Sequence, residues 1–158
     1  MDTSKLQYLL DRLELNDLVT RYFCSADERD FDKFRSCFVT GTAVDYSELL
    51  PVPAESPVEH VSQVIEATMG EHYGHTQHFM GNHTVTIDGD TARGTTYCLT
   101  IHQRLPPCED EPRLASALRY IDRFVRTDVG WRIEHRTVTR DIAFDLPGRP
   151  VVPMAGAS

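Results

Sequence analysis

Residues 15–38 read LNDLVTRYFCSADERDFDKFRSCF, and the spacing of their apolar side chains predicts two consecutive helices. Leu15, Val19 and Phe23 step by four residues and end at Asp27, as residues on one face of an α-helix do. Asp30 is then expected to cap a second helix. The apolar face of that second helix consists of Phe31, Phe34, Cys37 and Phe38. The first helix therefore carries the Asp27 carboxylate toward the interior of the protein.

Outside this stretch, helical patterns continue in both directions. The first helix is expected to run from Ser4 to about Asp27. Its neighbouring apolar side consists of Leu6, Leu9, Leu10, Leu13, Leu18 and Tyr22. Gly41 ends the second helix, residues 42–46 are expected to form a short strand, and a proline-bearing loop leads to a third helix. The apolar positions of that third helix are Val61, Val64, Ile65 and Met69.

After Gly74 the pattern changes to the alternation that is typical of β-strands. The expected strands cover residues 77–87, 91–103, 115–126 and 131–144, with hairpin turns at 88–90 and 128–130 and an acidic loop at 106–112. Helices followed by strands predict an α+β fold, in which a cone-shaped, curved, mixed or antiparallel sheet wraps around the N-terminal helices and leaves a pocket. Residues 1–146 are expected to form one domain, followed by a C-terminal tail at 147–158.

Length and charge exclude several classes of protein. A chain of 158 residues suits a single domain. With 16 basic and 24 acidic residues, a net charge of −8 and no basic stripe, nucleic acid is not expected as a partner. The charged N-terminus is unlike a secretory signal, and no apolar stretch is long enough for a membrane, so a cytoplasmic protein is expected.

Asp27 and His78 are the first candidates for chemistry. A carboxylate at the end of an apolar stripe must be paired, protonated or released to solvent, so Asp27 is either a functional group or an ordinary helix-terminal aspartate. His78 lies at the start of an expected strand and is either a core histidine or, beside a buried carboxylate, a general base. Spacing alone leaves these alternatives open.

Further polar side chains are candidates for lining the pocket. Arg136 and Arg140 share one face of the last expected strand, and an inward arginine can hold an anion. Tyrosines bury a ring and still offer one hydrogen bond. The candidate tyrosines are Tyr22, Tyr46, Tyr97 and Tyr120.

Neither the histidines nor the cysteines predict a metal site. His72, His75 and His78 are spaced by three, but a strand is expected to begin there, which argues against one helical ligand face. The cysteines lack the spacing of zinc or redox motifs and are expected to be free thiols. They are Cys24, Cys37, Cys98 and Cys108.

Several short motifs together make the chain resemble the SnoaL-like branch of the nuclear-transport-factor-2-like (NTF2-like) superfamily over about residues 6–144. The motifs are Tyr22 followed by Asp27, Asp30-Phe31-Asp32, Val44-Asp45-Tyr46, His78 followed by Gly81-Asn82, Ile87-Asp88-Gly89-Asp90, and Gly130-Trp131-Arg132-Ile133. The resemblance implies a cone-shaped, cystatin-like α+β barrel. Within the superfamily the chain is similar to the scytalone dehydratase-like lyases. Positions that carry catalysis there are matched by Asp27, Tyr46, His78 and His102.

A bile-acid 7α-dehydratase and a lindane dehydrochlorinase are also similar around Asp27, His78 and the Arg140-Asp141 dipeptide. The resemblance therefore implies a cofactor-independent dehydratase in which His78, oriented by Asp27, removes a proton from a small hydrophobic, oxygenated or polyketide-like substrate. In this hypothesis Tyr46 polarises a carbonyl and Arg140 holds negative charge. Assistance to the leaving hydroxyl comes from His102 or Tyr22, and Tyr120 lines the pocket.

Other functions stay open. The same proton abstraction serves a polyketide cyclase or a ketosteroid-isomerase-like isomerase, and the scaffold is similar to non-catalytic ligand-binding and assembly modules. The chain has Ala26, Leu118 and Tyr120 where the scytalone enzyme has other polar side chains, so the substrate is not implied. The exposed back of the sheet is expected to support a homo-oligomer, a dimer or trimer.

Overall fold

The computed structural model describes residues 3–106 and 112–147. Its helices are α1 (Thr3–Glu28), α2 (Phe31–Arg35) and α3 (Val58–His72). The predicted N-cap is confirmed, because the Asp30 carboxylate accepts a hydrogen bond from the backbone N–H of Lys33. No helix in these ranges has the length and apolar character needed to cross a membrane. Cys108, most of the predicted acidic loop and all but the first residue of the predicted tail lie outside the described residues.

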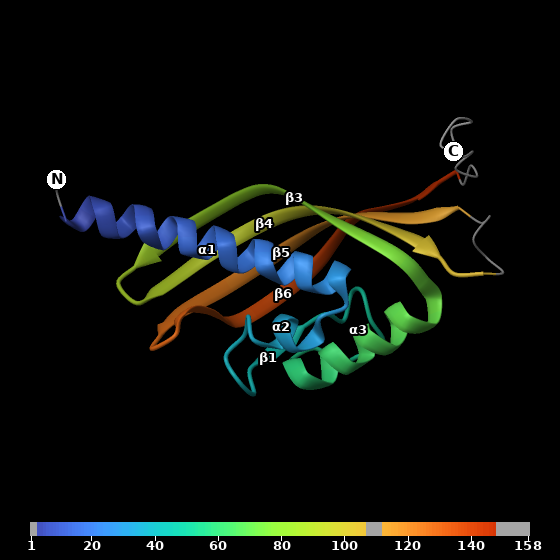
Figure 1. The fold of residues 1–158 in the computed structure, drawn as a ribbon, viewed down its shortest axis with the longest axis horizontal. Helices are drawn as coiled ribbons and strands as arrows, with labels where there is room; N and C mark the ends of the chain where they lie inside the picture. The colour runs from blue at the N-terminus through green and yellow to red at the C-terminus, as the bar shows by residue number, and fades with distance from the viewer. Residues whose placement is uncertain (1–2, 107–111, 148–158) are drawn as a thin grey trace, which may run out of the picture.

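Six strands form one mixed sheet (Figure 1). They are β1 (Ala43–Asp45), β2 (Ser56–Pro57), β3 (Tyr73–Asp88), β4 (Thr91–Arg104), β5 (Arg113–Thr127) and β6 (Gly130–Leu146). The four long strands are the predicted ones, and they pair with one another antiparallel. The short β1 joins β6 in parallel, which gives the order β2-β1-β6-β5-β4-β3. Since the edge strands β2 and β3 are not neighbours, the cone is open and not a closed barrel.

Turns and bulges set which side chains face the pocket. The predicted hairpin turns are confirmed, and both place a glycine at positive φ, +57° at Gly89 and +94° at Gly130. Two register shifts in the β5–β6 pair leave Glu134 and Asp141 unpaired as bulges. The second bulge reverses the side-chain alternation, because Arg140 lines the inner cavity whereas Ile142 is exposed on the outer face.

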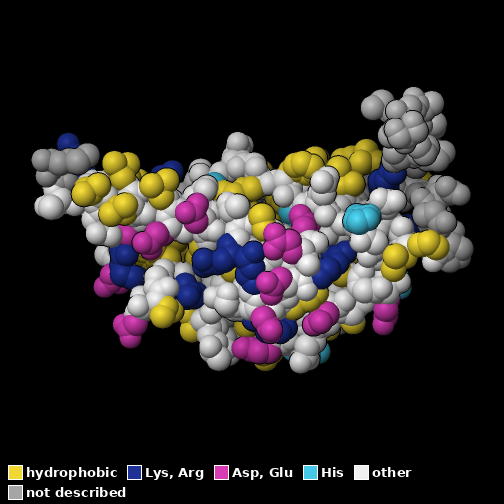
Figure 2. Space-filling view, viewed as in Figure 1, with side chains coloured by type: hydrophobic (Ala, Val, Ile, Leu, Met, Phe, Trp, Pro, Cys, Tyr) yellow, Lys and Arg dark blue, Asp and Glu magenta, His cyan; other side chains and the backbone are white. Residues whose placement is uncertain are grey.

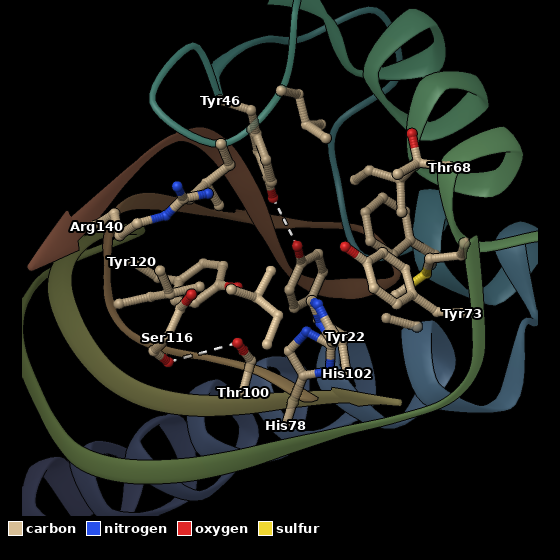
Figure 3. A pocket seen from close by; sticks show the side chains of 18 residues that line it. Tyr22, Tyr46, Thr68, Tyr73, His78, Thr100, His102, Ser116, Tyr120 and Arg140 are labelled. Atoms are coloured by element: carbon tan, nitrogen blue, oxygen red, sulfur yellow. Dashed lines mark hydrogen bonds between the residues drawn. The ribbon is translucent and has the colours of Figure 1, made fainter. Parts of the chain in front are cut away.

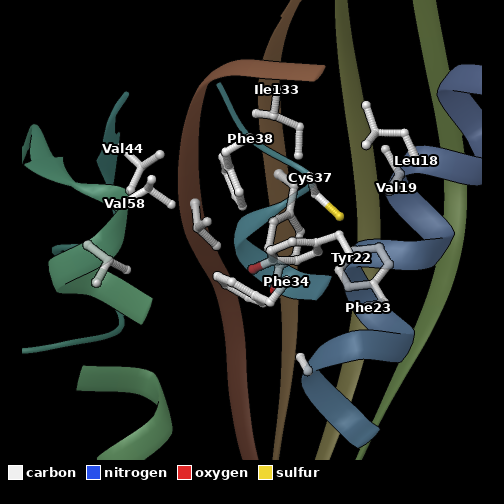
Figure 4. Packing of buried hydrophobic residues seen from close by; sticks show 14 of the residues in the cluster. Leu18, Val19, Tyr22, Phe23, Phe34, Cys37, Phe38, Val44, Val58 and Ile133 are labelled. Carbon is white, nitrogen blue, oxygen red and sulfur yellow. The ribbon is translucent and has the colours of Figure 1, made fainter. Parts of the chain in front are cut away.

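The helices cover the inner face of the sheet, and the core lies between the two layers (Figure 4). Leu15, Val19 and Phe23 are buried as predicted, and the phenylalanines of α2 pack beside them. The inner face of the sheet adds Phe124 and Ile133 to the same cluster. Burial of these large apolar side chains is the main contribution to the stability of the fold.

The prediction for the other side of α1 is wrong over its first half. The exposed residues of that row are Leu6, Leu9, Leu10 and Leu13. The cause is Asp11, a buried carboxylate that accepts hydrogen bonds from the guanidinium of Arg126 and the indole of Trp131. These contacts turn the Asp11 side of α1 toward the sheet. The leucines gather in solvent over the projecting N-terminal end of the helix (Figure 2).

A second buried charge pair joins Asp122 on β5 to Arg136 on β6. Neither side chain is exposed, and Nε and Nη2 of the guanidinium each donate to a carboxylate oxygen at 2.7 Å. Burial alone lowers the pKa of Arg136, but the Asp122 carboxylate outweighs burial and raises the pKa of the guanidinium. The guanidinium carbon also lies 4.0 Å from the ring centre of Tyr22 and 4.8 Å from that of Tyr120. Arg136 therefore supports the ring of Tyr22 from inside the core.

Replacing Arg136 by methionine is expected to lower the free energy of unfolding by about 3–5 kcal/mol, because it leaves the Asp122 charge buried without a partner. Chemical denaturation followed by circular dichroism measures the change. The matched control is the double variant Arg136→Met with Asp122→Leu, which removes both charges and should recover most of the loss. Equal stability of the single and double variants would contradict this account.

Candidate active site

A cavity of about 140 Å³ lies between the helices and the inner face of the sheet (Figure 3). Its apolar walls come from the helices, the loop after β1 and strand β5. Its polar lining consists of Tyr22, Tyr46, Thr68, Tyr73, His78, Thr100, His102, Ser116, Tyr120 and Arg140. The polar groups converge on a largely apolar space, an arrangement that suits a small organic molecule.

Asp27, in the last turn of α1, binds His78 on β3. Its Oδ1 lies 2.7 Å from Nδ1 of the His78 ring and 2.9 Å from the Thr76 hydroxyl, which donates to it. Its Oδ2 accepts the backbone N–H of His78 at 2.9 Å. Burial raises the pKa of Asp27, but the hydrogen bonds from His78 and Thr76 outweigh it, so the pKa lies below its ordinary value and the carboxylate is ionised.

The ionised carboxylate determines how the His78 ring presents itself to the cavity. A carboxylate can only accept hydrogen bonds, so Nδ1 of His78 is the donor. In the neutral ring the lone pair is then on Nε2. The His78 ring lines the cavity, whereas Asp27 is not part of the cavity lining. Phe23 stacks on the His78 ring, with ring centroids 5.7 Å apart. Asp27 and His78 are therefore within hydrogen-bonding reach at the cavity wall, which is what an acid/base pair requires.

Tyr22 on α1 and Tyr46 after β1 form a second polar group of the cavity. Their hydroxyl oxygens are 2.6 Å apart, and both side chains are buried (Figure 3). Burial raises the pKa of each phenol, whereas the Arg136 charge acts in the opposite direction. Both hydroxyls are therefore protonated near neutral pH. Because the contact between them uses one hydrogen, the other hydroxyl hydrogen is available to a ligand.

His102 on β4 lies beside His78, with ring centroids 5.9 Å apart. Neither of its ring nitrogens has a hydrogen-bond partner among the described residues. Burial lowers the pKa of His102 to about 4, and the neighbouring His78 adds to that shift. The ring is therefore neutral near pH 7. A neutral imidazole offers one donor and one acceptor to a bound molecule.

Of the other candidate residues, two line the cavity and two do not. Tyr120 and Arg140 line it together with Tyr22, Tyr46 and the two histidines. Figure 3 shows the Arg140 side chain reaching toward the space between them. Tyr97 lies on the outer face of the sheet and is 46% exposed, and Arg136 is paired with Asp122 in the core instead of facing the cavity.

Sequence reasoning missed four polar residues of the cavity lining, Thr68, Tyr73, Thr100 and Ser116. It also missed two residues behind the Asp–His pair. Thr76 precedes His78 by two residues and shares its face of β3, so strand alternation was a usable signal. Arg29 donates from its guanidinium to the Thr76 hydroxyl at 3.1 Å. Arg29 follows the end of α1, where an arginine side chain usually faces solvent. No local sequence pattern predicts its contact with Thr76.

Among the described residues, no three histidine, cysteine, aspartate or glutamate side chains converge as metal ligands do. His75 is exposed on the outer side of β3, away from His78. The described cysteines Cys24, Cys37 and Cys98 are free thiols, as expected. The polar groups of the cavity are thus an Asp–His pair, phenols, a neutral imidazole and a guanidinium.

Comparison with known proteins agrees with this fold. A family model described as a SnoaL-like domain matches residues 7–137. The chain belongs to the SnoaL-like family. The uncharacterized protein Rv2910c of Mycobacterium tuberculosis is 32% identical over 130 residues, which cover 82% of this chain and 85% of that protein. The predicted membership of the SnoaL-like family is confirmed.

Solved structures share the fold of this SnoaL-like domain over nearly its whole length. A candidate scytalone dehydratase from Novosphingobium aromaticivorans superposes with a TM-score of 0.76 at 18% identity, covering 96% of this chain and 97% of that one. A type 3 hexachlorocyclohexane dehydrochlorinase from Novosphingobium barchaimii gives a TM-score of 0.75 at 15% identity, covering 94% and 99%. At these identities the likeness concerns the fold, which enzymes acting on small molecules also adopt.

The low pKa of His102 predicts a pH dependence of stability. Above pH 6.5 the His102 ring is neutral in both the folded and the unfolded protein. Between pH 6.5 and about 4, the ring is protonated in the unfolded chain but stays neutral in the folded protein. Stability is therefore expected to fall as the pH drops through this window. Thermal unfolding at several pH values measures it, and His102→Gln should flatten the slope. An equal slope in both proteins would show that His102 is not the cause.

Proposed function

We propose that the protein is a cofactor-independent lyase, a dehydratase, that uses Asp27 and His78 on a small hydrophobic, oxygenated or polyketide-like substrate. The observation that carries this proposal is the 2.7 Å contact between Oδ1 of Asp27 and Nδ1 of His78, with the His78 ring at the cavity wall. The fold shared with a dehydrochlorinase supports the same class of reaction.

The first step is removal of a proton from a carbon beside a carbonyl. Nε2 of His78 takes the proton, since Nδ1 is engaged by Asp27. The Asp27 carboxylate stabilises the imidazolium that forms, as an orienting carboxylate does for a catalytic histidine. The electron pair of the broken C–H bond moves toward the carbonyl, whose oxygen becomes an enolate.

The enolate oxygen is stabilised by the tyrosine pair. The hydroxyl hydrogen that the Tyr22–Tyr46 contact does not use donates to it, with Tyr22 donating to Tyr46 and Tyr46 donating to the enolate. The Arg140 guanidinium at the cavity wall attracts the same negative charge. Tyr120 contributes its ring to the wall.

In the second step the enolate re-forms the carbonyl and expels a hydroxyl group from the neighbouring carbon. The proton held by His78 leaves with that hydroxyl as water, so one C–H and one C–O bond break and one C=C bond forms. His102 is neutral, so it assists by a hydrogen bond to the hydroxyl and not as an imidazolium acid. Tyr22 is the alternative partner of the leaving group.

The neutrality of His102 also favours a second candidate function, an isomerase or cyclase. Since the described residues of the cavity wall place no second charged acid near His78, the imidazolium can return its proton to another carbon, or the enolate can attack within the substrate. Product mass separates the reactions. Dehydration removes one water, isomerisation leaves the mass unchanged, and aldol-type ring closure proceeds without loss of water.

The proposal is tested with a panel of cyclic β-hydroxy ketones in D₂O. Deuterium uptake beside the carbonyl reports proton abstraction, and mass spectrometry reports loss of water. His78→Gln, which keeps a polar side chain but has no base, should abolish both signals. If the wild type and His78→Gln exchange deuterium equally on every ketone, His78 is not the base.

Asp27→Asn is expected to lower turnover by about 10²–10⁴-fold, because the amide keeps the shape of the carboxylate but cannot stabilise the imidazolium. The rate of deuterium uptake on the ketone that the wild type turns over best measures the loss. Circular dichroism controls for folding. Unchanged uptake by a folded Asp27→Asn protein would exclude the Asp–His pair.

We also propose that the protein is a homo-oligomer, a dimer or trimer, formed through the outer face of the sheet. Register places Phe79, Leu99, Ala117 and Ile142 in one row across four strands. Three of them, Phe79, Leu99 and Ile142, are large apolar residues that are 50%, 39% and 59% exposed. Monomers rarely expose such a continuous apolar row, and a second copy presents the same row in return.

The double variant Phe79→Lys with Ile142→Lys is expected to be monomeric, because lysine ammonium groups in the row repel their counterparts on a second copy. Sedimentation equilibrium measures the mass. The matched control is Val129→Lys, a substitution of an exposed apolar residue at the β5–β6 turn, which should keep the wild-type mass. A monomeric wild-type protein would contradict the proposal.

A further inference from the structure

Helix α1 ends at an arginine with an unusual backbone conformation. Arg29 has φ of +62°, in the left-handed region that favours glycine. The backbone N–H of Asp30 donates to the carbonyl of Ser25 at 2.9 Å, and that of Arg29 donates to the carbonyl of Ala26 at 3.2 Å. This pair of bonds is the Schellman motif, in which the position of Arg29 is usually glycine. An arginine at this strained backbone position costs conformational energy, so its side chain is expected to make contacts that offset the cost.

The side chain of Arg29 folds back toward the acid/base pair instead of pointing into solvent. Its Nη1 donates to the Thr76 hydroxyl at 3.1 Å and to the carbonyl of Ala26 at 3.3 Å, and its Nη2 donates to the carbonyl of Tyr73 at 3.3 Å. The guanidinium thereby joins the end of α1 to the start of β3. Burial lowers the pKa of Arg29, and the nearby Asp27 charge opposes that shift without cancelling it.

The Thr76 hydroxyl has only one hydrogen, and this hydrogen is given to Oδ1 of Asp27 at 2.9 Å. A hydroxyl that accepts from a guanidinium on one side must direct its hydrogen to the other side. Arg29 thus fixes the Thr76 hydroxyl as a donor to Asp27. The hydrogen bond from Thr76 in turn orients the Asp27 carboxylate so that its Oδ1 faces Nδ1 of His78.

We propose that Arg29 is a positioning residue of the acid/base pair, acting through the Thr76 hydroxyl to hold Asp27 and thereby the Nδ1–H tautomer of His78. The proposal deepens the proposed function and rests on it. A purely structural role, in which Arg29 only ties α1 to β3, predicts a change in stability but none in the His78 ring.

The test reads the His78 ring directly by ¹⁵N nuclear magnetic resonance, without any substrate. In the neutral wild-type ring, Nδ1 should carry a slowly exchanging proton and Nε2 should resonate as an acceptor, with His78→Gln identifying the signals. In Arg29→Gly, exchange of the Nδ1 proton should be about tenfold faster, which corresponds to the weakening of one hydrogen bond to a charged group. Arg29→Lys retains a charged donor and should restore part of the protection.

Two further variants separate positioning from folding. Thr76→Val keeps the branched shape, removes the hydroxyl and should reproduce the effect of Arg29→Gly. The double variant Arg29→Gly with Thr76→Val should protect the Nδ1 proton no less than the more strongly affected single variant does, because both substitutions break the same chain of hydrogen bonds from Arg29 through Thr76 to Asp27. Glu55→Gly is the control, since Glu55 is the other described non-glycine residue at positive φ and pairs with His135 away from the site. It should leave the His78 signals unchanged.

Wild-type proton exchange in a folded Arg29→Gly protein, or additive losses in the double variant, would overturn the proposal. If Arg29→Gly does not fold, Thr76→Val alone decides, and wild-type exchange in that variant overturns the proposal equally. Failure of the proposed function is distinguishable. It appears as deuterium uptake by the ketones that is insensitive to His78→Gln, whatever the ring signals of the Arg29 variants show.

Discussion

The hydrogen bonding of one partly buried carboxylate determines how α1 meets the sheet. Asp27 keeps its charge only because donors from β3 replace the water it has lost, and these donors are the hydroxyl of Thr76 and the backbone and ring of His78. One of them is main chain and two are side chains of alternate residues, so they fix the position of the C-terminal end of α1, whereas Asp11 sets the rotation of its first half. The direction of the His78 ring and the shape of the cavity follow from that position.

A second ionised pair supports the opposite side of the cavity. Asp122 and Arg136 are fully buried between β5 and β6, and the guanidinium lies against the ring of Tyr22. Each carboxylate is thus held by a set of donors, whereas the ring of His102, beside His78, has no hydrogen-bond partner among the described residues and stays neutral. The site combines an ionised Asp27 carboxylate and a charged Arg136 guanidinium with the neutral imidazole of His102.

Local patterns predicted the elements, because strand alternation, helical spacing and turn glycines act within a few residues. Local pattern marked Asp27 and His78 as candidates, but it left open whether they meet, and only the resemblance to the family motifs paired them. The Leu6–Leu13 side of α1 was not, because the rotation of that helix depends on Asp11 meeting Arg126, a residue 115 positions away. The roles of Arg136 and Arg29, and the neutrality of His102, likewise arise from burial and from contacts between distant strands.

The bulge at Asp141 determines which face of the sheet the last residues of β6 occupy. In a regular strand every second residue shares a face, so Arg140 and Ile142 would both point inward or both outward. The unpaired Asp141 shifts that alternation by one residue, so that a cavity residue and a residue of the outer apolar row stand almost adjacent in sequence. If Asp141 joined the ladder, Ile142 would turn to the face that Arg140 occupies, and the outer apolar row would lose one of its members.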